Sequence, residues 1–370
     1  MPVELYRILK SPDKKEYYGP GVLVTEPRVL TAMTIPLEDI SGSDWAPDMI
    51  MGKTIGYSTG SSKETVRNGL LYVTTGTLLQ LLRSTPYEKF ISMYRFIVLD
   101  EVHMRSLDLD LTMMLLKKLL IEMIGHKDCP FIILTSATFD AHKFAHYFGI
   151  DTETNIISVA GQSQPISDNF LEHDSNDVFK SIADIVRLIH EDKVNYMKQG
   201  ENDILIFVPG AGEMKKVYAL LVQMNVEFIK QKKKCYALLK IDRQAVSINS
   251  RDVSLVFANY DKLTINMKGE FDKMGENKAY RRIIISTEVA ETGLTIPTLG
   301  HVIDIGVYRG VEHYPPMNIE GLLTKCCPKT KITQRRGRAG RKFPGHYYGM
   351  YTEETYNMLT PRELPNIITD

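Results

Sequence analysis

The sequence lacks any long apolar run and any excess of charge of one sign. No apolar run approaches the ~18 residues of a transmembrane helix, and the first residues, MPVELYRILK, contain no apolar signal-peptide segment. We therefore expect neither a membrane span nor a secretory leader. Because 45 Lys and Arg residues balance 45 Asp and Glu residues, a basic field over the whole molecule is excluded. Any nucleic-acid site must then be a local patch or groove.

Cysteine is scarce and shows no pattern of a metal or disulfide framework. The four cysteines are Cys129, Cys235, Cys326 and Cys327, and none forms a CxxC pair. No cysteine pair stands at zinc-ligand spacing, so we expect no zinc site. Reduced thiols are typical of an intracellular protein, and we predict a cytoplasmic or nuclear location.

Composition indicates a globular chain with two cores. Hydrophobic residues make up 44% and charged residues 24% of the 370 residues. At about 150 residues per domain, this length predicts two domains.

Short runs rich in Val and Ile recur along the chain. Apolar and polar residues mostly do not alternate within them, which is typical of strands buried on both faces of a parallel sheet. These runs are residues 21–25, 96–99, 131–134, 204–208, 283–285 and 301–305. Helical spacing is clearest in 110–124 and 178–190. The alternation predicts an α/β fold with parallel sheets.

The strand–helix pattern occurs twice, before residue 150 and after residue 200. A largely polar stretch, 152–176, separates the two halves, and its Gly161 and Pro165 favour a boundary at about 158–172. We place domain 1 at residues 1–160 and domain 2 at residues 161–360.

The sharpest local signal is Asp100-Glu101-Val102-His103, which directly follows the apolar run 96–99. In open α/β sheets, ligands bind at the carboxyl ends of the strands. A carboxylate at such a place can hold Mg²⁺, and a second can orient an attacking water.

A second signal is the basic segment 334–341, QRRGRAGR. Arg338 and Arg341 are three residues apart, so they would share one face if this segment is helical. Two guanidinium groups on one face suit a phosphate that gains charge during transfer. Gly337 and Gly340 favour close packing against this turn.

Small hydroxyl residues follow two other predicted strands. Ser136 and Thr138 follow the run 131–134, where they could bond to the carboxylates of a neighbouring strand. Residues 286–296, STEVAETGLTI, follow the run 283–285.

Together these segments resemble the motifs of superfamily 2 helicases of the DExH type, closest to the DEAH/RHA group. Seven segments stand in the order of that family's motifs Ia to VI and cover nearly the whole chain. They are 26–28, 75–79, 100–103, 136–138, 206–210, 286–296 and 334–341. His103 and the Arg335-Arg336 pair also resemble poxviral and flaviviral members, which favours a viral protein.

The resemblance implies two tandem RecA-like domains that bind ATP, or another NTP, with Mg²⁺ between them. Asp100 would hold the metal with Glu101, which would also activate water. Gln334 would help to position that water, and Arg338 and Arg341 would act as arginine fingers.

Further roles follow from the same resemblance. His103 belongs to the catalytic motif, and Ser136 and Thr138 would couple hydrolysis to domain movement. Arg105 and an aromatic residue of the second domain would hold the adenine. The family's aromatic position holds Val307 here, and Tyr308 follows it.

Nucleic acid would contact Arg28, Thr75 and Gly76 in the first domain and Thr292 in the second. Because no base-reading module is evident, we expect sequence-tolerant binding to the backbone of a single-stranded or partly duplex RNA. The resemblance favours RNA, and DNA stays open.

The phosphate-binding P-loop of this family, GxxxxGK[ST], is absent from the sequence. Gly52-Lys53-Thr54 does not supply it, because Pro47 stands where the motif needs its first glycine. We expect the sequence to begin just after the P-loop, so that the first sheet lacks that strand. Residues 361–370 resemble the start of a winged-helix region.

Two functions stay open from the sequence. One is an NTP-dependent RNA helicase motor core, of the NTPase class, in which these 370 residues have little ATPase activity for lack of a P-loop. The other is a helicase-like RNA-binding module without enzymatic activity. The basic run 230–234 is typical of a solvated surface, although it could contact nucleic acid.

Overall fold

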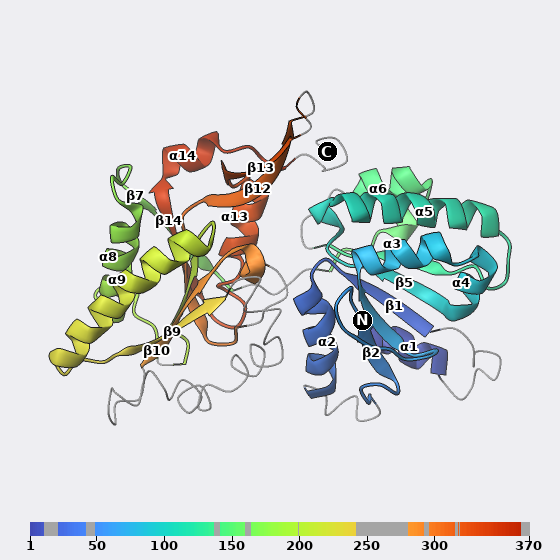
Figure 1. Ribbon diagram of the computed structural model, residues 1–370, viewed down its shortest axis with the longest axis horizontal. Helices are drawn as coiled ribbons and strands as arrows, with labels where there is room; N and C mark the ends of the chain where they lie inside the picture. Colours follow the sequence, from blue (N-terminus) through green and yellow to red (C-terminus); the bar gives the residue numbers. More distant parts are fainter. Residues whose placement is uncertain are drawn as a thin grey trace. The chain divides into compact units, whose positions relative to one another are not determined.

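The computed structural model describes residues 1–10, 21–41, 49–136, 141–159, 164–198, 200–241, 280–291, 296–314, 317 and 319–363. The chain divides into two compact units, Met1–Val159 and Ala160–Glu363, which are described separately below. Each unit is an α/β layer structure built on one main sheet (Figure 1). The predicted α/β fold class with parallel sheets of RecA-like type is therefore confirmed. No helix among the described residues is both long and apolar enough to cross a bilayer.

The sheet of unit 1 has six described strands in the order β3-β2-β4-β1-β5-β6. All neighbouring strands are parallel except β2 and β3. The strands are β1 (Gly21–Glu26), β2 (Ile55–Ser58), β3 (Lys63–Glu64), β4 (Leu70–Thr74), β5 (Tyr94–Leu99) and β6 (Phe131–Leu134).

Helices cover both faces of this sheet (Figure 1). One face packs against α3 (Thr75–Ser84), α4 (Tyr87–Met93) and α5 (Leu107–Met123) through a core that includes Leu23 and Ile97. The other face, with Val22, Val24 and Val98, packs against α1 (Pro2–Lys10) and α2 (Val29–Ser41). Successive residues of a strand point to opposite faces. Because helices cover both faces of the sheet, every residue of β1 is buried.

Helix α5 begins earlier than the predicted segment 110–124, because Ser106 caps it. The Ser106 side chain accepts a hydrogen bond from the Leu109 backbone N–H, and acidic Asp108 and Asp110 lie in the first turn. Unit 1 ends with α6 (Ala141–Phe148) and the short α7 (Thr152–Asn155).

Strand β6 differs from its prediction as a strand buried on both faces. It forms the edge of the described sheet, and Phe131 is 55% exposed. Its apolar sequence therefore has only one neighbouring strand, β5, among the described residues.

The sheet of unit 2 has six parallel described strands in the order β7-β14-β11-β8-β10-β9. They are β7 (Ile166–Leu171), β8 (Asp203–Phe207), β9 (Tyr236–Ile241), β10 (Arg281–Ser286), β11 (Leu299–Asp304) and β14 (Gly345–Thr352).

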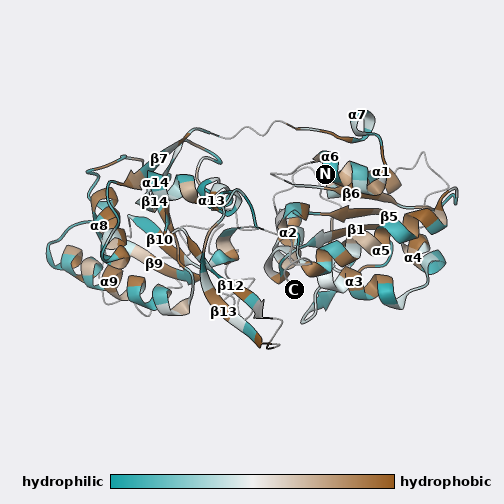
Figure 2. Cartoon of the chain, turned by 90° about the horizontal axis from the view of Figure 1, so that it is seen from above, coloured by the Kyte–Doolittle hydropathy of each residue, from teal (hydrophilic) through white to brown (hydrophobic). Residues whose placement is uncertain are grey.

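One face of this sheet packs against α8 (Val178–His190) and α9 (Ala211–Lys230), with Ile204 and Ile206 in the core between them. Helix α9 carries both polar and apolar residues along its whole length, as expected for a helix with one buried side (Figure 2). Phe207 of β8 points to the face of the sheet opposite to that of Ile204 and Ile206. The guanidinium of Arg335 in α13 (Lys329–Arg336) lies over the Phe207 ring. Helix α13 therefore covers the other face.

The remaining elements of unit 2 follow the strand ends. The 3₁₀ turn η3 (Glu288–Glu291) comes after β10. An antiparallel hairpin, β12 (Val307–Tyr314) and β13 (Ile319–Cys326), comes after β11, and α14 (Glu353–Met358) comes after β14.

Candidate active site

Two carboxylates meet at the carboxyl ends of β1 and β5. These strands are parallel neighbours with Thr25 opposite Leu99, so Glu26 and Asp100 follow side by side. The Asp100 backbone N–H donates to the Thr25 carbonyl at 3.2 Å, and the Thr135 hydroxyl donates to the Asp100 carboxylate. With Glu101, Glu26 and Asp100 form what we call the carboxylate edge.

Glu26 is a member of this site that the sequence analysis did not select. Its side chain is buried, and burial together with the nearby Asp100 charge raises the pKa of Glu26 to about 8. The signal that could have identified it is its place at the end of a buried strand next to the strand of Asp100.

The loop after Asp100 has an unusual backbone. Glu101 (φ 53°) and Arg105 (φ 46°) are both left-handed, and they flank the short 3₁₀ turn η1 (Val102–Met104). Such a conformation costs a non-glycine residue on the order of 1 kcal/mol or more and persists only where neighbours fix it. Here the buried Val102 donates its backbone N–H to the Thr135 carbonyl at 3.1 Å.

His103 joins the ends of β5 and β6. Its Nδ1 lies 2.8 Å from Ser136 Oγ and 3.3 Å from Glu101 Oε2. Burial lowers the pKa of His103, which favours the neutral ring. The structure thus brings together the predicted residues Glu101, His103 and Ser136, whereas Thr138 lies outside the described residues.

Arg105, predicted to hold the adenine, is fixed by a carboxylate. Its Nε and a terminal nitrogen donate to the two oxygens of Asp110 at 2.7 and 3.0 Å. Asp110 is buried, so this pair of hydrogen bonds holds the guanidinium in one orientation. The centre of the Phe144 ring lies 5.7 Å from the guanidinium carbon.

The carboxylate edge suits Mg²⁺ better than a metal that needs many protein ligands. The described residues contain no group of three or more His, Cys, Asp or Glu side chains placed to hold a metal ion. Mg²⁺ commonly takes one or two carboxylates and completes its shell with water and substrate phosphates. Asp100 and Glu101 are two such carboxylates at this strand end.

Unit 2 contains a buried arginine at the corresponding edge of its sheet. Arg335 is fully buried and donates to Glu291 at 2.6 Å, to Asp304 at 2.7 Å and to the Val307 carbonyl at 3.2 Å. It therefore ties α13 to the turn η3, to the end of β11 and to the start of β12.

Asp304 receives further hydrogen bonds at this point. The Gly306 N–H donates to Asp304 at 2.9 Å, and the Tyr347 hydroxyl donates to it at 3.0 Å. Arg335 is not among the predicted site residues, because nothing in the sequence distinguishes it from the half-exposed Arg336 beside it.

The prediction that Arg338 and Arg341 share one face of a helix is wrong. Helix α13 ends at Arg336, and the following residues form a turn in which Gly340 has φ +69°. A Cβ atom at Gly340 would lie 2.6 Å from the Ile166 side chain, so the predicted close packing at this glycine is confirmed.

The other predicted residues of this segment differ in exposure. Arg338 is buried, Arg341 is exposed, and Gln334 lies partly buried in the last turn of α13. Their assignment as water-positioning and finger residues stays a prediction.

Tyr308 lies in β12 and is mostly buried. Its hydroxyl donates to Glu363, and the Lys331 ammonium lies 4.1 Å from the centre of its ring. One ring face is therefore covered by a cation from its own unit, and adenine stacking by Tyr308 stays a prediction.

The predicted nucleic-acid residues of unit 1 lie near the starts of two helices. Arg28 precedes α2, and Thr75 and Gly76 begin α3, whose N-cap Thr74 makes no side-chain capping bond. A helix N-terminus with free backbone N–H groups can bind phosphate. Thr292 lies outside the described residues.

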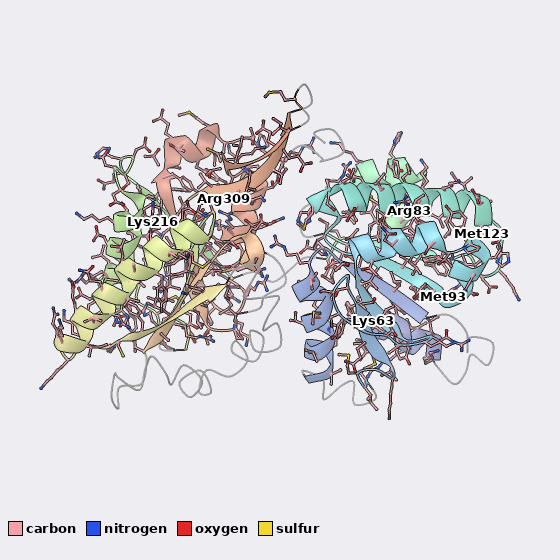
Figure 3. The ribbon with its side chains drawn as sticks, viewed as in Figure 1. Lys63, Arg83, Met93, Met123, Lys216 and Arg309 are labelled. Atoms are coloured by element: carbon pink, nitrogen blue, oxygen red, sulfur yellow. The ribbon has the colours of Figure 1, made fainter. Side chains whose placement is uncertain are left out.

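A basic residue that the sequence analysis missed stands at the N-terminal end of α9 (Figure 3). Arg309 of β12 donates to Glu213 at 3.2 Å and lies so close to Gly210 that a Cβ atom there would approach its Nε to 2.9 Å. This places a guanidinium beside the segment that resembles motif IV.

Comparison with known families and proteins shows what the chain is similar to. Residues 182–343 match the family described as Helicase conserved C-terminal domain. Protein B962L of African swine fever virus, named as a candidate RNA helicase, is 39% identical over 378 residues in a Malawi isolate and 38% identical in a South African isolate. Both alignments cover 100% of this chain and 39% of the relative. The chain thus spans about two fifths of the length of the curated relatives it matches.

Solved structures share the fold. The Escherichia coli DEAH/RHA helicase HrpB matches with a TM-score of 0.76 and 23% identity, over 100% of this chain and 41% of that chain. A second structure of HrpB, titled a DExH-box NTPase, matches with a TM-score of 0.69 and 23% identity, over 40% of its length.

Proposed function

We propose that this chain, which belongs to the DExH type of superfamily 2 helicases as its motifs predict, forms most of a motor core that couples NTP hydrolysis to movement along RNA. The carboxylate edge carries this proposal. It combines a buried strand end, two adjacent acids, a strained loop and a histidine linked to Ser136.

In this proposal Asp100 and Glu101 would hold Mg²⁺ in the presence of a nucleoside triphosphate. The metal supplies charge neutralisation at the phosphates when it is bound. Glu101 orients the attacking water, and Thr135 keeps the Asp100 carboxylate in position through its hydrogen bond. His103 keeps Glu101 and Ser136 together.

Residues of unit 2 complete the proposed chemistry. Gln334 positions water, and Arg338 and Arg341 stabilise charge on the transferred phosphate, as the family resemblance implies. Arg335 holds the segment that carries them against Glu291 and Asp304. Arg105 is the proposed adenine contact of unit 1, since Asp110 already orients its guanidinium.

The missing phosphate loop limits what these residues can do alone. The printed sequence contains no GxxxxGK[ST], so nothing in it supplies the backbone cradle and lysine that this family uses for the β and γ phosphates. The edge of β6, apolar and paired on one side only among the described residues, offers a place for a further strand. We propose that a phosphate-binding strand pairs there, and that these 370 residues alone hydrolyse NTP poorly.

RNA is the proposed nucleic acid, and the African swine fever virus relatives named as candidate RNA helicases support it. Arg28, the α3 N-terminus with Thr75 and Gly76, and Thr292 are the proposed contacts. We further propose an intracellular, virus-encoded protein, in keeping with those relatives.

A second candidate function is an RNA-binding module without enzymatic activity. The absence of the phosphate loop favours it for these residues, whereas the acids at 100 and 101 and the arginines at 338 and 341 favour the motor.

Equilibrium binding of a fluorescein-labelled 20-nucleotide oligouridylate tests the nucleic-acid part of the proposal. We expect binding at 50 mM salt that weakens roughly 10-fold or more by 200 mM, because the strand is held by its phosphates. No binding, or binding insensitive to salt, would contradict a backbone groove.

A further inference from the structure

A basic pocket lies in unit 2 where α8 and α9 end. The two helices pack side by side, and α8 ends at His190 and α9 at Lys230. The pocket has a volume of about 550 Å³ and is lined by Lys193 after α8 and by Lys232, Lys233 and Lys234 after α9. We call these four residues the lysine pocket. It lies at the end of α9 opposite to Arg309 (Figure 3).

The backbone on both sides of the lysine pocket is fixed in the same way. Asp192 (φ 55°) and Lys232 (φ 56°) have left-handed backbone conformations and lie two residues after the last residues of α8 and α9. In each turn the next residue closes the helix end, since the N–H groups of Lys193 and Lys233 donate at 2.9 Å to carbonyls five residues earlier.

A histidine links the two turns. His190 Nε2 donates to the Lys234 carbonyl at 2.9 Å, and burial lowers the pKa of His190 to about 4, so the ring is neutral. The lysine side chains therefore project from a backbone that is already ordered, which reduces the entropy lost when a ligand binds.

The charge around the lysine pocket is not balanced. Among the described residues that line it, four lysines stand against two carboxylates, Glu191 and Asp192, and the buried Arg281 lies on Asp192 as well. The C-terminal ends of two helices add about half a negative charge each. An excess of about two positive charges remains in a chain whose net charge is zero.

Capping of the helix ends accounts for only part of this arrangement. Glu191 accepts from Lys193 at 2.6 Å and from Lys233 at 2.9 Å. Asp192 lies 3.3 Å from Arg281 and 3.6 Å from Lys234. Lys232 is exposed and has no carboxylate within ion-pair distance in the part of the chain that the structure describes.

The surroundings favour phosphate over bases as the ligand. Lys234 lies 3.8 Å from the centre of the Tyr280 ring, and Lys233 lies 5.8 Å from that of Phe228, so lysines cover the aromatic faces on which a base would stack. Ammonium groups bind phosphate oxygens as point charges. The volume lies within the range of ligand pockets, ~300–1,000 Å³.

We propose that the lysine pocket binds phosphodiester groups of a nucleic-acid strand, as a contact separate from the strand-end motifs. The inference rests on the proposed nucleic-acid function and extends it to a second edge of unit 2.

Lysine acetylation footprinting of the whole chain tests the inference. The chain is treated with an acetylating reagent with and without the 20-nucleotide oligouridylate, and the modified lysines are quantified by mass spectrometry. We expect the oligonucleotide to slow modification of Lys232 and Lys193 at least 5-fold. The exposed Lys198 of the same unit, outside the pocket, should react at the same rate in both samples.

A matched pair of variants gives the second measurement. Lys232→Glu should weaken oligouridylate binding about 5-fold at low salt and reduce the slope of log K against log salt by about 0.7 or more. Lys198→Glu, with the same change in net charge, should alter affinity less than 2-fold.

The outcomes separate this inference from the proposed function. A chain that binds the oligonucleotide with Lys232 unprotected overturns the inference alone, as do equal effects of Lys232→Glu and Lys198→Glu. Protection by inorganic tripolyphosphate but not by the oligonucleotide would assign the pocket to free polyphosphates and also overturn it. A chain that binds no oligonucleotide contradicts both proposals.

Discussion

Unit 1 gathers carboxylates at the carboxyl ends of its strands, whereas unit 2 buries an arginine at the same edge of its sheet. In unit 1, Glu26 lies beside Asp100, and burial together with the nearby Asp100 charge raises the pKa of Glu26 to about 8. In unit 2, Glu291 and Asp304 each receive a hydrogen bond from Arg335. In unit 2 the two buried carboxylates are thus paired with a cation of their own unit, whereas in unit 1 burial and the nearby Asp100 charge favour the neutral, protonated form of Glu26.

Removal of the buried arginine should have the largest effect. Arg335→Ala leaves Asp304 buried without its cation and Glu291 with only the Lys331 ammonium 3.8 Å away, and we expect unit 2 to lose about 3–5 kcal/mol of unfolding free energy. Hydrogen exchange measured by mass spectrometry can follow β11 and α13 separately from unit 1.

Arg336→Ala is the control, because the half-exposed Arg336 pairs with Asp168 at the surface. It should cost less than about 1 kcal/mol. Equal losses in the two variants would show that Arg335 does not organise this edge.

Neutralisation of the buried acid in unit 1 should have a smaller, pH-dependent effect. The pKa of Glu26 is about 8 in the folded chain, against an ordinary value of 4.5. Folding therefore holds a proton that the unfolded chain releases, and stability is lost as the pH rises from about 4.5 to about 8. Glu26→Gln should remove this loss and gain roughly 3 kcal/mol at pH 7 but little at pH 4.5.

Urea unfolding across this pH range measures the difference between the variant and the parent chain. Glu64→Gln, at an exposed position of β3, should follow the parent at every pH. A Glu26→Gln profile parallel to that of the parent would mean that Glu26 is ionised in the folded chain.

The smallest expected effect concerns the link between β5 and β6. Ser136→Ala removes the partner of His103 Nδ1 and should cost about 1 kcal/mol, the usual contribution of one hydrogen bond. Thermal unfolding checks this, with the exposed Ser92→Ala as a control that should change stability by less than about 0.5 kcal/mol. A neutral result for Ser136→Ala would show that His103 is held by other contacts.

The sequence predicted the parallel strands well because their signal is local. The apolar runs 96–99, 204–208 and 283–285 coincide with β5, β8 and β10 within a few residues, and 178–190 is α8. The acids at 100 and 101 were found for the same reason, since they directly follow such a run.

Features set by tertiary contacts were not predictable. Adjacent Arg335 and Arg336 look alike in the sequence, but the helical turn of α13 buries one and leaves the other at the surface. The end of α13 at Arg336 overturned the expected shared face of Arg338 and Arg341. The proximity of Glu26 and Asp100 depends on the pairing of β1 with β5, 74 residues apart between Thr25 and Leu99.

Steady-state phosphate release from ATP, with Mg²⁺ and oligouridylate, tests most directly whether the site chemistry requires a phosphate loop that these residues lack. We predict no RNA-stimulated release above background from this chain, because the motif that holds the β and γ phosphates is absent from the sequence. Turnover at about 1 s⁻¹ or faster, in the ordinary enzymatic range, that is abolished by Glu101→Gln would contradict this and show that other residues bind those phosphates.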